Sequence, residues 1–190
     1  MAQGNNHERL KRLVRTALFA ALLCLLSPMV IPIKPIPISL GLFAVLLTGA
    51  MLDFPDGAAA TLLYLFLGGI GLPVFSGGGA GFGVLIGPTG GYLWSYPLVA
   101  LLVGFGTKIL FRKMAEKKLI RQMLGVFLLT LPGVLLCYVA GTVQYMIISG
   151  AALRPALAGC VLPFIPIDLC KCLAVAIITP RVRAALYGIS

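Results

Sequence analysis

Residues 57–107 read GAAATLLYLFLGGIGLPVFSGGGAGFGVLIGPTGGYLWSYPLVALLVGFGT and contain no charged side chain. As a single helix these 51 residues would be about 75 Å long, whereas about 20 apolar residues suffice to cross the hydrocarbon core of a bilayer. The stretch therefore has to fold back on itself. Between Gly68 and Gly91 it is too rich in Gly and Pro for a regular helix. We predict one membrane helix before this segment and another after it, with irregular backbone between them.

The rest of the chain has the same apolar character, because 60% of the 190 residues are hydrophobic and only 11% are charged. Soluble domains carry roughly a quarter of charged residues, so a soluble protein is excluded. We expect an all-α integral membrane protein with six transmembrane helices in a single bundle, forming one domain over residues 1–190. Three prolines, Pro32, Pro35 and Pro37, predict an extended connector between the first two helices. The predicted spans are residues 13–33, 36–52, 57–72, 91–111, 122–149 and 162–180.

Lys and Arg predict the orientation, since cytoplasmic segments carry an excess of them. With the N-terminus inside, only Lys34 and Arg154 face outward, and Lys171 falls within a span. An even number of helices then places both termini in the cytoplasm. The net charge of +10 is therefore a topology signal and not a nucleic-acid-binding patch. Twelve basic residues fall on the cytoplasmic side: Arg9, Lys11, Arg12, Arg15, Lys108, Arg112, Lys113, Lys117, Lys118, Arg121, Arg181 and Arg183.

Asp168 and Lys171 are the ionisable pair inside a predicted span. Three residues apart, they share a helix face. Charges at membrane depth cost about 3 kcal/mol each on insertion scales, so such residues face the bundle interior and pair with each other or with a ligand. The pair is a candidate binding site, and the alternative is an ion pair that only fixes the sixth helix.

The glycine-rich segment from Gly68 to Leu93 is a second candidate, because irregular backbone at membrane depth occurs where it is buried in protein or lines a cavity. A phosphate cradle is excluded by the absence of a GxGxxG pattern and of a following Gly-Lys-Ser/Thr. The segment suits a mostly neutral small molecule, and the alternative is a re-entrant loop that packs only for stability. The single histidine, His7, lies in the polar N-terminal part, so we expect neither an enzyme nor a metal or cofactor site.

Weaker features permit two interpretations each. Ala17 and Ala21 have the four-residue spacing of close helix packing, either within the chain or against a partner protein. Lys34 and Arg154 are either attractors for an anionic group or interfacial anchors. Trp94 and Tyr96 are either interfacial aromatics or part of a cavity wall.

Four motifs in this order closely resemble the BioY family of biotin transporters: PIPIS at 35–39, LLYLFLGGIGLPVF at 62–75, GPTGGYL at 87–93 and PFIPIDLCK at 163–171. The resemblance implies the substrate-capturing membrane subunit, or S component, of an energy-coupling factor transporter. It implies biotin as the transported ligand and no cofactor. Asp168 and Lys171 would bind the ureido ring, and Lys34, solvent or loop amides would receive the carboxylate. The remaining implied contacts are Phe75, Gly78, Gly79, Gly81, Phe82 and Tyr92.

The resemblance also implies partners besides biotin and membrane lipid: two cytoplasmic ATPases and a transmembrane coupling protein that docks near Ala17 and Ala21. The alternatives are an S component for another vitamin and a solitary biotin transporter without a coupling module. The chain departs from the family pattern at Gly41, where many members carry Gln, and at Gly78 or Gly79, where some have a polar side chain.

Overall fold

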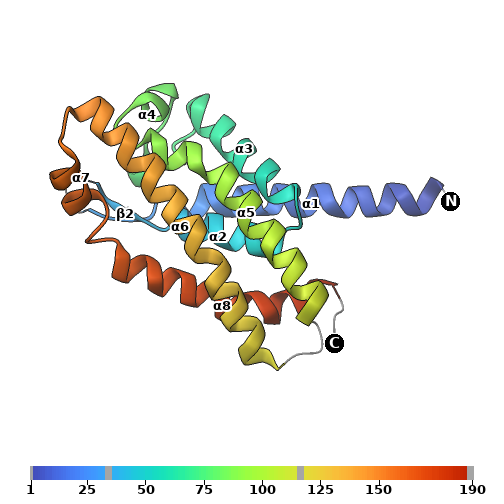
Figure 1. The fold of residues 1–190 in the computed structure, drawn as a ribbon. Helices are drawn as coiled ribbons and strands as arrows, with labels where there is room; N and C mark the ends of the chain where they lie inside the picture. Colours follow the sequence, from blue (N-terminus) through green and yellow to red (C-terminus); the bar gives the residue numbers. More distant parts are fainter. Residues whose placement is uncertain (1, 33–35, 115–117, 188–190) are drawn as a thin grey trace.

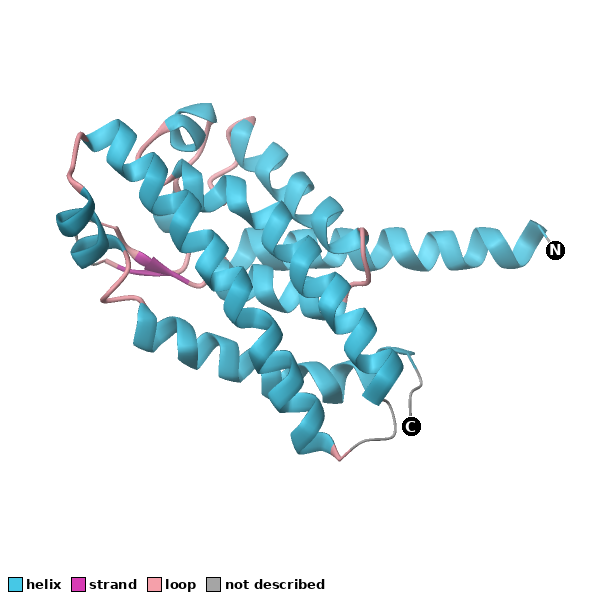
Figure 2. Cartoon of the chain, viewed as in Figure 1, coloured by secondary structure: helices cyan, strands magenta, loops and turns pink. Residues whose placement is uncertain are grey.

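The computed structural model describes residues 2–32, 36–114 and 118–187, and this part of the chain is mainly helical (Figures 1 and 2). A short antiparallel hairpin of β1 (Val30–Ile31) and β2 (Ile38–Ser39) follows the first helix, and a 3-10 turn covers Ser76–Gly78. The helices are α1 (Ala2–Leu26), α2 (Gly41–Met51), α3 (Asp56–Gly69), α4 (Phe82–Ile86), α5 (Gly90–Met114), α6 (Leu119–Ser149), α7 (Leu153–Cys160) and α8 (Ile165–Tyr187).

Two helices of the described residues are by themselves long and apolar enough to cross a membrane, Gly90–Lys113 and Leu119–Ser149. A third span results if α7 and α8, which are bent by 48°, count as one. The helix α2 has 11 residues and α3 has 14, so they extend only about 16 and 21 Å. The six membrane crossings thus stay a prediction, because fewer than six of the described helices are long and apolar enough to cross a membrane by themselves.

The first two predicted spans were too long at the connector. The helix α1 ends at Leu26 and not at residue 33, and α2 begins at Gly41 and not at residue 36. Uncharged sequence does not distinguish helix from strand, and the prolines favour extended backbone here. The paired strands align Val30 with Ser39 and Ile31 with Ile38.

Smaller boundary differences have local causes. The helix α3 ends at Gly69 instead of residue 72, close to Gly71, whose φ of 113° favours glycine. The glycine-rich segment is not wholly irregular, since it contains the 3-10 turn and the short helix α4. The last helix runs from Ile165 to Tyr187, later at both ends than predicted.

The helix α2 lies in the centre of the bundle, in contact with α1, α3, α5, α6 and α8. Small residues permit this close packing: a Cβ added at Gly49 would lie 2.9 Å from the carbonyl oxygen of Ala100 in α5. The main core joins α2 to α5, α6 and α8 through fully buried side chains. Among them are Val45, Leu46, Val99, Val103, Val126 and Val175.

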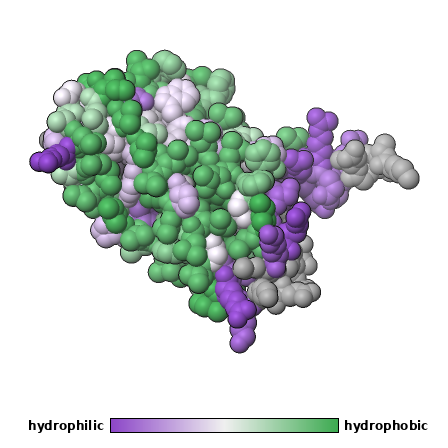
Figure 3. Space-filling view, in the orientation of Figure 1, coloured by the Kyte–Doolittle hydropathy of each residue, from purple (hydrophilic) through white to green (hydrophobic). Residues whose placement is uncertain are grey.

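Charged residues gather at the end of the molecule that carries both termini, seen as purple atoms on the right in Figure 3. There Arg12 of α1 makes a two-pronged ion pair with Asp56, with nitrogen–oxygen distances of 2.9 and 2.7 Å. This hydrogen-bonded contact raises the pKa of the Arg12 guanidinium further above its ordinary value. The hairpin, α4 and α7 lie at the opposite end (Figure 1). The two ends of the bundle therefore differ strongly in charge.

Candidate functional site

Asp168 and Lys171 form the predicted ion pair, with 2.7 Å between Lys171 Nζ and Asp168 Oδ1. The two residues are only 2% and 8% exposed, which is rare for charged side chains. Asp168 lies in the first turn of α8, where backbone amides and the helix dipole favour a negative charge. Pro166 also lies in this first turn. Proline is tolerated there because the backbone N–H groups of a first turn have no partner within the helix. The sequence thus places a buried carboxylate at a helix N-terminus beside its own counter-ion.

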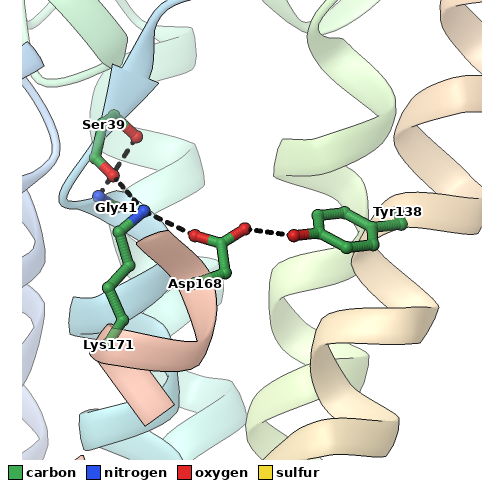
Figure 4. A network of polar contacts seen from close by, with 5 residues as sticks. All are labelled: Ser39, Gly41, Tyr138, Asp168 and Lys171. Carbon is green, nitrogen blue, oxygen red and sulfur yellow. Dashed lines mark hydrogen bonds and ion pairs between the residues drawn. The ribbon is translucent and has the colours of Figure 1, made fainter. Parts of the chain in front are cut away.

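This ion pair belongs to a longer polar network that joins three parts of the chain (Figure 4). Lys171 Nζ also donates to the backbone carbonyl of Ser39 in β2, at 2.8 Å. On the other side, the hydroxyl of Tyr138 in α6 donates to Asp168 Oδ2, at 2.7 Å. The network therefore runs from the hairpin through α8 to α6.

The network borders a cavity of about 260 Å³. This volume is slightly below the range of roughly 300–1,000 Å³ that is typical of small-molecule sites. Most of its surface is apolar, with a few polar groups that could orient a ligand. The lining residues are Ile36, Pro37, Ser39, Leu42, Ser76, Val84, Thr89, Tyr92, Leu93, Tyr96, Cys137, Tyr138, Phe164, Asp168 and Lys171.

Two tyrosines of α5 form an aromatic wall of this cavity. Tyr92 donates from its hydroxyl to the carbonyl oxygen of Cys160, at 3.2 Å, which ties the wall to α7. Tyr96 is 5% exposed and stacks at 6.3 Å on Tyr64 of α3. Tyr96 is therefore part of the cavity wall, while Trp94 is 48% exposed.

Another wall of the cavity comes from the glycine-rich segment, which polar side chains of the bundle hold in place. Gln144 of α6 donates from its amide nitrogen to the carbonyls of Leu85 and Gly87, at 3.0 and 2.8 Å. Trp94 Nε1 donates to the same Leu85 carbonyl at 3.1 Å. These bonds satisfy carbonyls at the end of α4 and fix Val84 and Thr89 at the cavity.

Gly41 packs against two residues that line the cavity, Ser39 and Tyr96. A Cβ added there would lie 2.7 Å from Tyr96 Oη and 3.1 Å from Ser39 Oγ. Any larger side chain would have to displace these hydroxyl groups. The packing of Tyr96 and Ser39 accounts for glycine at this position.

The predicted contact residues divide into four groups. Asp168, Lys171 and Tyr92 line the cavity. Phe75 is fully buried behind it, against Tyr64. Lys34 lies outside the described residues. Gly78, Gly79, Gly81 and Phe82 are not among the residues that line the cavity, and the Phe82 side chain is 60% exposed.

The model of the BioY family matches residues 2–188. The chain belongs to the BioY family. Biotin transporter BioY2 of Lactococcus lactis is 34% identical over 90% of this chain and 89% of its own length. Biotin transporter BioY of Thermotoga maritima is 31% identical, with coverage of 92% and 96%.

A solved structure is also similar, described as the S-component for biotin from an ECF-type ABC transporter. Its TM-score is 0.81 at 28% identity, and the match covers 94% of this chain and 93% of that chain. These BioY relatives are named as transporters, so the chain belongs to a family of membrane transporters and not of enzymes.

Within this BioY chain, the sequence did not identify Ser39 or Tyr138 as members of the polar network. Ser39 contributes through its backbone carbonyl, which leaves no signature in the side chain. Tyr138 lies thirty residues before Asp168, in another helix. The sequence around a single tyrosine in an apolar helix does not indicate which residue accepts its hydrogen bond. The apolar stretch around Tyr138 predicts a helix but not the face that it presents.

Proposed function

We propose that this protein captures biotin from the outer side of the membrane as an S component. The observation that carries the proposal is the buried pair of Asp168 and Lys171 at the cavity wall. The relatives are named biotin transporters, and the similar solved structure is described as an S-component for biotin. A transporter family and a cavity with a charged pair together favour capture of a small polar ring.

The hydrogen-bonding capacity left over in the pair matches a cyclic urea. Lys171 has three N–H donors, and two of them bind Asp168 and Ser39 within the described part of the chain. Asp168 offers about four lone-pair sites, and Lys171 and Tyr138 use two. One donor and two acceptor sites remain. The ureido ring of biotin presents the complement, one carbonyl acceptor and two N–H donors.

The rest of biotin has matching surroundings. The apolar thioether ring suits the aromatic and aliphatic walls formed by Tyr92, Tyr96, Phe164 and Leu42. Ser76 and Thr89 line the cavity and carry hydroxyls that can donate to the carboxylate. The Ser76 oxygen is buried and has no hydrogen-bond partner among the described residues. Lys34 remains a candidate for the same carboxylate.

Uptake against a gradient requires energy from partner proteins. We place both termini and the charged end of the bundle in the cytoplasm of a prokaryotic cell, with six helices in the plasma membrane. A transmembrane coupling protein and two cytoplasmic ATPases would complete the transporter. Ala17 and Ala21 lie on an exposed face of α1, which leaves room for a coupling protein there.

The test is an equilibrium titration of the purified protein with biotin. We expect one tight site, and Asp168→Asn or Lys171→Met should weaken binding by about 2–5 kcal/mol, because each strands a buried charge or polar group. Arg181→Met is the matched control: it removes a positive charge from the same helix, but Arg181 is exposed and its hydrogen bond is to the carbonyl of Ile177 in that helix. Full affinity in both site variants would refute the site, and binding of another vitamin in place of biotin would refute the ligand.

A further inference from the structure

Asp168 borders two separate cavities. One is the polar cavity described above. The other is an apolar groove of about 270 Å³ between α6 and α8. Tyr138 and Asp168 are the residues that line both. The other lining side chains of the groove carry neither oxygen nor nitrogen: Leu131, Val134, Leu135, Val161, Ile165, Leu169 and Cys172.

We propose that Tyr138 is a positioning residue for Asp168. The hydroxyl of Tyr138 fixes the Asp168 carboxylate in the orientation that receives the ligand. The inference rests on the proposed function, since it assigns a role toward the ring of biotin. Tyr138 acts through Asp168 by the hydrogen bond of 2.7 Å between Tyr138 Oη and Asp168 Oδ2.

The carboxylate of Asp168 is held from two sides, as Figure 4 shows. Lys171 holds Oδ1 from the hairpin side, and Tyr138 holds Oδ2 from the α6 side. With one bond to each oxygen, rotation of the carboxylate about its bond to Cβ would break a charge-assisted hydrogen bond. The remaining acceptor sites therefore keep a fixed direction, which is what recognition of two N–H groups in a rigid ring requires.

The groove explains why the tyrosine hydroxyl is needed. On the groove side, apolar side chains offer no other oxygen or nitrogen within the described residues. If the hydroxyl is absent, Oδ2 borders an apolar space without a donor, and an unsatisfied buried acceptor is costly. The carboxylate would then turn toward Lys171, and its acceptor sites would no longer match the ligand.

The first experiment follows the carboxylate directly, without ligand. The chain contains three aspartates, Asp53, Asp56 and Asp168, so labelling with aspartate carrying ¹³C at the side-chain carboxyl gives three NMR signals. The signal lost in Asp168→Asn is that of Asp168. We expect Tyr138→Phe to move this signal and leave the other two in place. Tyr145→Phe, the same change on the same helix at a residue outside both cavities, should move none.

The second experiment measures biotin affinity in a double-mutant cycle. Tyr138→Phe should weaken binding on the order of 10-fold, the usual loss for a hydrogen bond to a charged group. In an Asp168→Ala background the same change should cost less than about 2-fold, because the group on which Tyr138 acts is gone. A structural role alone would give the same loss in both backgrounds.

The outcomes separate this inference from the proposed function. If the wild-type protein binds biotin, and Tyr138→Phe changes neither affinity nor the Asp168 signal, the inference is overturned and the function stands. Equal losses in both backgrounds overturn it as well. If the wild-type protein binds no biotin, the proposed function fails, and the NMR signal alone supports or overturns the contact between Tyr138 and Asp168.

Discussion

Phe75 supports the cavity without touching it. Its ring is fully buried and meets Tyr64 edge to face, with 5.5 Å between ring centroids. Tyr64 in turn stacks on Tyr96, which lines the cavity. Gly68 in α3 provides the space for Phe75, because a Cβ at Gly68 would clash with the ring. One glycine thus permits a chain of three aromatic rings behind the cavity wall.

Gly68→Ala should therefore destabilise the protein although alanine favours helices. Displacing Phe75 is an overpacking change, which costs about 1–3 kcal/mol. Thermal unfolding in detergent and a biotin titration measure the effect. The unfolding temperature and the affinity for biotin should both decrease. Gly69→Ala is the matched control, since its Cβ would meet only Leu85 Cδ1 at an ordinary 3.6 Å. Equal stability of the two variants would contradict this account.

The site residues that can be predicted from the sequence are those whose burial alone costs free energy. Asp168 and Lys171 are charged within an apolar run, so their pairing follows from the cost of burying a charge, and the structure confirms it. Phe75 is a different case: the family resemblance implied contact with the ligand, but its ring is fully buried against Tyr64 and is not among the residues that line the cavity. The direction of an uncharged ring depends on the packing of several helices, which one sequence motif does not contain.

Among the elements, α8 is fixed at its far end by Arg183. This side chain is 4% exposed and donates to the carbonyls of Ala50 and Met51 at the end of α2, at 3.0 and 3.3 Å. It also pairs with Asp53 Oδ1 at 3.0 Å and lies over the ring of Phe111 in α5, 5.1 Å from its centroid. A positive charge at a helix C-terminus is favourable, so one arginine joins α2, α5 and α8.

Arg183→Leu should lower the free energy of unfolding by about 2–4 kcal/mol, slightly less than the loss for a fully buried pair because Asp53 is partly exposed. Arg181→Leu should have little effect, since Arg181 is exposed and bonds within its own helix. Chemical unfolding of both variants provides the measurement. Similar losses in the two would show that the contacts of Arg183 are not decisive.

The short elements were the least predictable from sequence. The prolines predict extended backbone in the connector, and the two short strands of the hairpin confirm this for the described residues on either side of residues 33–35. The pairing of Val30 with Ser39 is a tertiary contact that the prolines do not predict. The apolar run that contains α2 is long enough for a span, yet the helix has only 11 residues. Its length is set by the hairpin on one side and by the capping contacts of Arg183 on the other.

At the scale of the whole molecule, the distribution of charge is the main asymmetry. Figure 3 shows hydrophilic residues mainly at the end with both termini and apolar surface over most of the remaining face. The apolar face suits lipid contact. The charged end is where the basic residues of α1 meet the turn at Asp53 and Asp56. This arrangement is the one that the predicted orientation requires, with the charged end in the cytoplasm.

Reporter fusions to the full chain test the orientation. Alkaline phosphatase, which is active only outside the cytoplasm, should be inactive when fused after residue 190. It should be active when inserted after Gly150, in the turn between α6 and α7. Green fluorescent protein, which matures in the cytoplasm, should fluoresce at the C-terminus and serves as the reciprocal control. The reverse pattern would overturn the orientation inferred from Lys and Arg.

The contact between Lys171 and the hairpin has a consequence for how this protein can change over evolution. Lys171 binds the main-chain carbonyl of residue 39, so this contact places no requirement on the side chain there. Many substitutions at Ser39 would preserve it, and comparison of substituted positions would not reveal it. A one-residue slip of β2 against β1 would break it at once, because a different carbonyl would face the ammonium group. Lys171 therefore selects the register of the hairpin, and this contact by itself does not depend on which side chain residue 39 carries.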